Sequence, residues 1–209
     1  RGGFIIDIGS GLSNSIAYGE DTSDPPVERW MLGFELKSGP KGNTTFINSS
    51  SAHDGAGLPY YATASNWTSG SVPFGNDYIS NGQIGFGNAT WVRGGKQIAD
   101  GDDYRNIGRS TNGGNTHPTV DWDEISAQFN TAQNIYGLVY MKGSVNKWIS
   151  AGANGEIKTT AFTGSARGSG DTWTTPTTPD TQQMNDIATD HITAVAVGAQ
   201  GRIWSSTDA

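Results

Sequence analysis

The sequence predicts an all-β fold built from about four repeated units. Its 209 residues include 30 Gly, and only 16% are charged, a composition that favours turns over long helices. Tryptophan recurs at the start of similar phrases, at Trp30, Trp91 and Trp148, and a fourth copy carries alanine at Ala194. Short runs of β-forming residues alternate with Gly/Asn/Ser turns. Self-similarity at a spacing of roughly 50 residues indicates an array of like units.

The third unit shows the pattern most clearly. Strands are predicted over residues 134–141, 147–153 and 156–162, with a fourth starting at 171–174. The pair Asn154-Gly155 predicts a tight hairpin, because both residues tolerate positive φ.

The other units follow the same plan with more variation. In the second unit, strands are predicted over 82–87, 90–95, 105–111 and 119–125, and in the fourth over 191–198 and 202–206, around a turn at 199–201. The first unit offers 15–19, 29–34 and 60–67, with the polar stretch 37–58 expected to be an insertion loop. Helical signal is nearly absent: the segments 121–132 and 180–188 could each form a turn or two, but neither has a convincing apolar stripe.

Four-stranded units of this size match the blades of a β-propeller. We expect a single domain, 1–209, with approximate blades 10–75, 76–126, 127–178 and 179–209, the last of them incomplete. Each tryptophan in register is expected to lie in the core between blades. Two alternatives remain for the last blade: either residues 3–8 supply its missing strand, or the chain is part of a larger propeller. The second is favoured because four-bladed rings are uncommon.

One motif resembles a known repeat family. Residues 110–117, Ser-Thr-Asn-Gly-Gly-Asn-Thr-His, resemble the Asp-box (BNR) pattern Ser-x-Asp-x-Gly-x-Thr-Trp, with Asn112 in place of Asp and His117 in place of Trp. Residues 203–209 resemble the first half of another box, and 157–160 with 171–173 resemble an interrupted copy. The resemblance implies a β-propeller of the kind found in sialidases, xyloglucanases, sortilin-like receptors, photosystem II assembly-factor-like proteins and phage tail or fibre proteins.

The sequence contains no pattern that predicts catalysis. The arginine motif of sialidases is missing, and no spacing singles out a glycosidase carboxylate pair among Asp7, Glu20, Asp54, Asp121 and Glu124. The histidines, His53, His117 and His191, have no metal-ligand spacing, and no Gly-x-Ser-x-Gly elbow is present. We therefore expect a protein that is not an enzyme and needs no cofactor.

Two groups of residues are candidate binding sites. The acid cluster Asp100, Asp102 and Asp103 could hold Ca²⁺, although a solvated turn is the favoured interpretation because the full calcium-loop pattern is missing. The stretch 37–61 carries Phe46, His53, Tyr60 and Tyr61 among small polar residues, which suits sugar stacking or an adaptable protein contact.

Composition narrows the expected partners. A net charge of −7 disfavours binding to nucleic acid, and no apolar run approaches the roughly 20 residues of a membrane span. We expect a binding or structural module of an extracellular assembly, foremost a phage virion tail, fibre or surface-decoration protein. Its expected partners are other structural proteins of the same assembly or a cell-surface glycan. The alternatives are a polysaccharide-active glycoside hydrolase and an assembly-factor-like protein-binding propeller.

Overall fold

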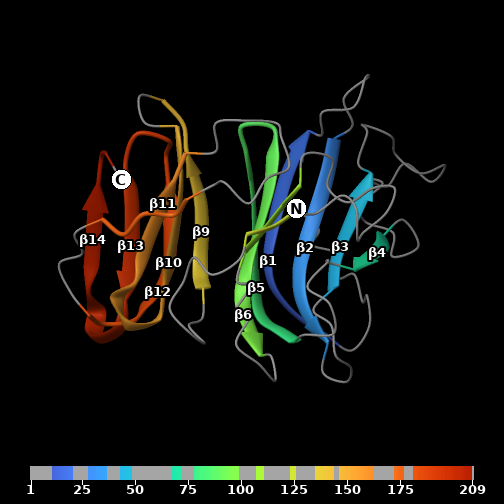
Figure 1. The fold of residues 1–209 in the computed structure, drawn as a ribbon, viewed down its shortest axis with the longest axis horizontal. Coiled ribbons are helices and arrows are strands. Elements are labelled where there is room, and N and C mark those ends of the chain that lie inside the picture. The colour runs from blue at the N-terminus through green and yellow to red at the C-terminus, as the bar shows by residue number, and fades with distance from the viewer. Residues whose placement is uncertain are drawn as a thin grey trace, which may run out of the picture.

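The fold consists of four antiparallel β-sheets that follow one another along the chain (Figure 1). The computed structural model describes residues 11–20, 28–36, 43–48, 67–71, 78–98, 107–110, 123–125, 135–143, 146–161, 172–176 and 181–208. In these residues the regular structure is β-strand apart from two short 3₁₀ turns. This confirms the prediction of an all-β protein made of about four blade-type units, the last of them incomplete.

Each sheet is a meander, in which strands follow their order in the sequence. The first sheet contains β1 (Gly11–Glu20), β2 (Glu28–Leu36), β3 (Asn43–Asn48) and β4 (Trp67–Ser71). The second contains β5 (Tyr78–Gly87), β6 (Thr90–Ile98), β7 (Ile107–Ser110) and β8 (Asp123–Ile125). The third contains β9 (Ile135–Met141), β10 (Lys147–Gly152) and β11 (Ile157–Thr160), and the fourth contains β12 (Met184–Thr189), β13 (Ala194–Gly198) and β14 (Ile203–Ser206).

The sheets stack face to face through their first strands. Strand β1 contacts β5, β5 contacts β9, and β9 contacts β12. Figure 1 shows the result, with β4 and β14 at opposite ends of the molecule. Each inner sheet therefore covers one face with the preceding sheet and the other face with the following sheet, which is the stacking of propeller blades.

The repeat seen in the sequence is a repeat in space. A tryptophan lies near the start of the second strand in each of the first three sheets, at Trp30, Trp91 and Trp148. Each of them pairs across the sheet with an aromatic residue of the first strand. The ring centroids are 5.1 Å apart for Tyr18–Trp30, 4.7 Å for Phe86–Trp91 and 5.4 Å for Tyr140–Trp148. Such cross-strand aromatic pairs stabilise a sheet beyond simple burial.

Three of the tryptophans lie in the core between sheets, as predicted, whereas Trp30 lies beside the exposed Tyr18 on the outer face of the first sheet, where the prediction is wrong. Trp91 and Trp148 are fully buried and Trp173 is nearly so. Trp91 packs with Met31 of the first sheet, and Trp148 packs with Val92 of the second. Trp122 lies outside the described residues, so the prediction for it is untested.

Two tight turns show the predicted geometry. Asn154 and Gly155 have φ of 56° and 68°, and the Glu156 N–H donates to the Ala153 carbonyl over 3.1 Å. The fourth sheet has the same turn at Gln200-Gly201, with φ of 61° and 72°. The hairpin signal at 154–155 is therefore confirmed, and its equivalent recurs one sheet later.

The expected insertion loop at 37–58 was wrong in part. Strand β3 lies inside it and pairs with β2 on one side and β4 on the other. The run Thr44-Thr45-Phe46-Ile47 is rich in β-forming residues. The polar residues on both sides of this run are typical of a loop, which is why the sequence pattern predicted a loop there.

The expected helical turn at 180–188 was also wrong, because this segment forms most of β12. Met184 and Ile187 of β12 are buried between the third and fourth sheets. Backbone pairing with β13 and packing against β9 override the weak local preference. Within 121–132, the described residues Asp123–Ile125 form strand β8 rather than a helical turn.

Candidate functional site

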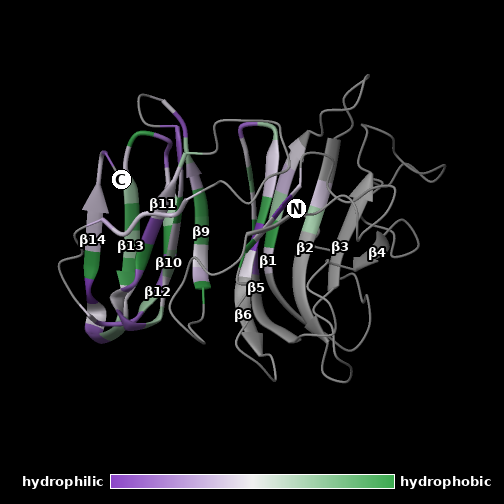
Figure 2. Cartoon of the chain, in the orientation of Figure 1, coloured by the Kyte–Doolittle hydropathy of each residue, from purple (hydrophilic) through white to green (hydrophobic). Residues whose placement is uncertain are grey.

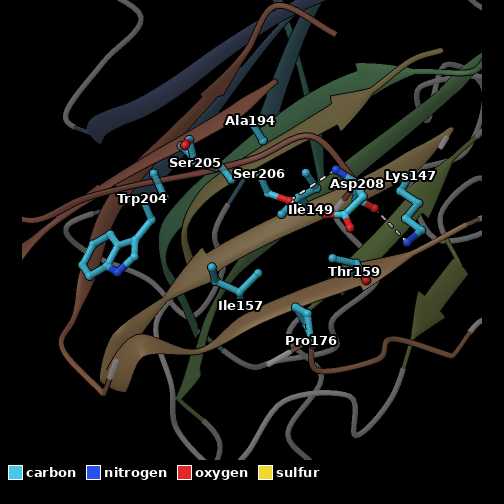
Figure 3. A pocket seen from close by; sticks show the side chains of 12 residues that line it. Lys147, Ile149, Ile157, Thr159, Pro176, Ala194, Trp204, Ser205, Ser206 and Asp208 are labelled. Carbon is cyan, nitrogen blue, oxygen red and sulfur yellow. Dashed lines mark hydrogen bonds between the residues drawn. The ribbon is translucent and has the colours of Figure 1, made fainter. Parts of the chain in front are cut away.

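A pocket of about 530 Å³ opens between the third and fourth sheets. Its walls come from β10, β11, β13 and β14, and Pro176 closes one side (Figure 3). Much of the lining is apolar: Ile149, Ile157, Ile187, Ala194, Ala196 and Trp204. A concave site with apolar walls and a few polar groups suits the binding of a small ligand or a side chain.

The two ends of the pocket differ in chemistry. Figure 3 shows the Trp204 indole at one end and Lys147 with Asp208 at the other. The Lys147 Nζ donates to the main-chain oxygen of Asp208 over 3.2 Å. The Ser206 hydroxyl donates to the Asp208 carboxylate over 2.8 Å, and the Asp208 N–H lies 3.3 Å from the same hydroxyl oxygen. The polar end therefore presents hydrogen-bonding groups held by the last strand.

Within the described residues, the large side chains of the preceding interface have no counterparts around the pocket. Strand register makes Ala194, opposite Thr189, the equivalent of Trp148, opposite Tyr140. Between the second and third sheets, Trp148 and Trp173 fill the space beside Val92 and Ile107. The corresponding residues beside the pocket are Ile149 and Ile157, and there the tryptophan position holds alanine.

Trp173 reaches its place through a short bridge to the edge of the third sheet. Thr174 and Thr159 exchange backbone hydrogen bonds of 2.9 and 2.8 Å, and their hydroxyls lie 3.3 Å apart. In the fourth sheet, register places Ser205 of β14 at the position of Thr159. Within the described residues β14 is the edge strand of its sheet, so no Thr174 equivalent pairs with Ser205 there.

A buried cation lies away from this pocket. Arg93 of β6 is fully buried, and burial lowers the pKa of its guanidinium to about 9. That value is still above neutral pH, so Arg93 stays charged inside the second sheet.

The pocket is not the site that the sequence predicted. Phe46 lies in β3, where its backbone pairs with Met31 and Thr68, and not in a loop. His53, Tyr60 and Tyr61 lie outside the described residues, as do Asp100, Asp102 and Asp103. In the part of the chain that the structure describes, no three His, Asp or Glu side chains are grouped to hold a metal ion. The overlooked signal was Ala194, an alanine where the repeat carries tryptophan.

Comparison with known proteins gives a fold and no family. The chain shares its fold with a computationally designed protein. The crystal structure of that protein, Ika4, matches with a TM-score of 0.53 and 11% identity, over 99% of this chain and 97% of the designed one. At this identity the likeness concerns the fold alone. No protein-family model matches the sequence, and no curated protein is similar to it.

A second solved structure, YCF48 from Cyanidioschyzon merolae, matches with a TM-score of 0.45 and 14% identity. The match covers 81% of this chain and 48% of YCF48. A score of this size does not establish a common fold. In the residues that the structure describes, no helix is long and apolar enough to cross a membrane.

Proposed function

We propose that this protein is a non-enzymatic binding module, and that its pocket between the third and fourth sheets receives an aromatic side chain from an extended segment of another protein in the same assembly. One observation carries the proposal. The pocket occupies the position that Trp173 fills between the second and third sheets, with Ile149 and Ile157 in the roles of Val92 and Ile107. A surface shaped for an indole in one interface is a fitting acceptor for an aromatic ring in the next.

The neighbouring strand supports an extended ligand. Ser205 holds the position at which Thr159 binds the backbone of Thr174. An incoming strand could pair with β14 in the same way and place its aromatic residue in the pocket. Backbone pairing at a sheet edge with a side-chain pocket beside it is a common mode of peptide recognition.

The pocket chemistry supports binding rather than hydrolysis. Among the lining residues Asp208 is the single carboxylic acid, whereas glycosidases of the usual kind need two that flank the bond. The Lys147 ammonium group lies at the same end and adds a positive charge there.

The wider setting we propose is an extracellular or virion assembly, foremost a phage tail, fibre or surface-decoration protein. The acidic, cysteine-free composition and the partial Asp-box motifs support this setting. In this setting a cell-surface glycan is a second candidate ligand. The competing functions are a glycoside hydrolase and an assembly-factor-like protein-binding propeller.

A peptide copied from this chain tests the pocket. The peptide spans residues 169–176 and contains Trp173, and a matched peptide carries alanine in place of that tryptophan. Isothermal titration calorimetry should detect binding of the tryptophan peptide at one site per chain and no binding of the alanine peptide.

Two variants at one position supply the control. Ser206→Phe places a ring in the pocket and should abolish peptide binding, whereas Ser206→Thr keeps the hydroxyl that bonds Asp208 and should preserve it. Equal binding of both peptides, or binding that survives in Ser206→Phe, would refute the pocket as the site. Turnover of a glycan that depends on Asp208 would favour the glycoside hydrolase instead.

A further inference from the structure

We infer that two copies of this chain associate head to tail, with the outer face of the first sheet of one copy packed on the outer face of the fourth sheet of the other. The inference rests on the two end faces of the array and is independent of the pocket. We call the outer face of the first sheet the head, made of Ile16, Tyr18 and Trp30. The outer face of the fourth sheet is the tail, made of Ala188, Val195, Val197 and Ile203.

The head carries the side chains that other sheets bury against their predecessor. Strand register aligns Ile16, Tyr18 and Trp30 with Ile84, Phe86 and Trp91 of the second sheet, and with Leu138, Tyr140 and Trp148 of the third. Ile84 is 4% exposed, whereas Ile16 is 56% exposed. Tyr18 is 44% exposed, while its equivalent Tyr140 is 8% exposed. Within the described residues, no other sheet covers this blade interface of the first sheet.

The tail carries the side chains that other sheets bury against their successor. Val195 holds the position of Met31, Val92 and Ile149, which are at most 2% exposed, yet Val195 is 38% exposed. Ile203 holds the position of Ile107, which is fully buried, and is 71% exposed. Together with Val197 these residues form a largely apolar sheet face, on which Asp186 lies opposite Val197, of the kind that a following blade covers.

The sizes of the residues identify the occupant. Where the next sheet brings a tryptophan, the accepting sheet offers a small residue: Ala17 packs with Trp91, and a Cβ on Gly85 would meet Trp148. Where the next sheet brings Ala194, the accepting position is the larger Val139. The tail has Ala188 at this position, so it is shaped for a sheet that carries tryptophan. The exposed head carries Trp30.

Asp190, two residues after Ala188, also affects how closely a head can pack on the tail. Two residues after the small accepting residue, on the same face, the first two sheets have glycine, at Gly19 and Gly87, and the fourth sheet has Asp190 two residues after Ala188. The Asp190 carboxylate accepts hydrogen bonds from the Ile192 and Thr193 N–H groups over 2.9 and 2.7 Å, which hold it in its own turn.

The two faces cannot cover each other within one copy, since both are exposed there and β4 and β14 lie at opposite ends of the array (Figure 1). A head-to-tail contact is heterologous, and such contacts end only when a ring closes. Two copies close the smallest ring and leave neither face exposed. Figure 2 shows hydrophobic residues along β9 and β13.

Sedimentation velocity of the 209-residue chain and of charge variants tests the inference. The wild type should sediment as a dimer of a 22.0 kDa chain. Ile16→Lys blocks every head and Val195→Lys blocks every tail, so each variant alone should be monomeric. An equimolar mixture pairs the intact tail of one variant with the intact head of the other, and dimers should return. Ala161→Lys adds the same charge at an exposed residue outside both faces and should remain dimeric.

Each alternative gives a different result. A monomeric wild type overturns the inference. Dimers in one single variant but not the other indicate a face-to-face contact and exclude head-to-tail packing, as does a mixture that stays monomeric. A larger closed ring would keep the head-to-tail contact and overturn the copy number. Circular dichroism establishes that each variant is folded. Ser206→Phe should stay dimeric, which separates this result from the fate of the pocket.

Discussion

The ring of Tyr140 lies directly against the backbone of Gly87, across the boundary between the second and third sheets. The same relationship joins Phe86 to Gly19 one boundary earlier. At the next boundary the glycine position holds Met141, and the aromatic position holds Thr189. At this boundary the larger side chain lies on the preceding sheet and the smaller one on the following sheet, the reverse of the two earlier boundaries. The spacing between sheets therefore depends on the combined size of the two residues.

Gly87→Ala should therefore destabilise the protein. An added Cβ would overlap the Tyr140 ring, and overpacking of this kind costs about 1–3 kcal/mol. Chemical denaturation measures the loss. The control is a double-mutant cycle with Tyr140→Gly, which removes both the ring and the Cβ that the added group would meet, so the cost of Gly87→Ala should fall. An unchanged cost would mean that the glycine is needed for its backbone and not for the ring.

Removal of the buried tryptophans should have a larger effect. Trp91→Ala or Trp148→Ala should each lower the free energy of unfolding by about 3–5 kcal/mol, because both side chains are fully buried between sheets. Trp204→Ala should cost less, since Trp204 is only half-buried beside the pocket. Thermal and denaturant unfolding of the three variants would rank them. Equal losses would contradict the packing described.

The turn at Gln200 offers a stabilising change. Gln200 has φ of 61°, a left-handed conformation that costs a glutamine side chain more than an asparagine, and its counterpart in the third sheet is Asn154. Gln200→Asn should raise the free energy of unfolding by a few tenths to about 1 kcal/mol. Asn154→Gln is the matched reverse change and should lower it by a similar amount. Melting temperatures that move in the same direction for both would refute the equivalence.

The turn at Asp190 should make stability depend on acid. Hydrogen bonds from the backbone N–H groups of Thr193 and Ile192 lower the pKa of the Asp190 carboxyl below its ordinary value. A carboxyl with a depressed folded-state pKa stabilises the fold above the unfolded pKa of about 4, and that contribution is lost as pH falls through the folded value. Carbon NMR titration should report the low pKa. Asp190→Asn should flatten the acid dependence of unfolding below about pH 4.

Much of the fold could be predicted because it is local and repeated. The spacing of Trp30, Trp91 and Trp148 marked the second strands, and Asn154-Gly155 marked a turn whose two positive φ values are a property of those residue types. The sequence was less informative where pairing with neighbouring strands decides whether a segment forms a β-strand. Strand β3 lies within a polar stretch, and β12 lies within a segment without a strong strand pattern, yet each is fixed by its neighbours.

The pocket and the end faces depend on contacts between residues far apart in the chain. The sequence by itself determined the composition of each strand, the turns and the repeat, because these follow from the preferences of adjacent residues. Only the tertiary structure decided that Ala194 faces the space that a tryptophan fills one interface earlier, and that Ile16 and Val195 remain exposed where their equivalents are buried. Whether a side chain is buried depends on which sheet packs against it, and that is decided by how the sheets stack in three dimensions.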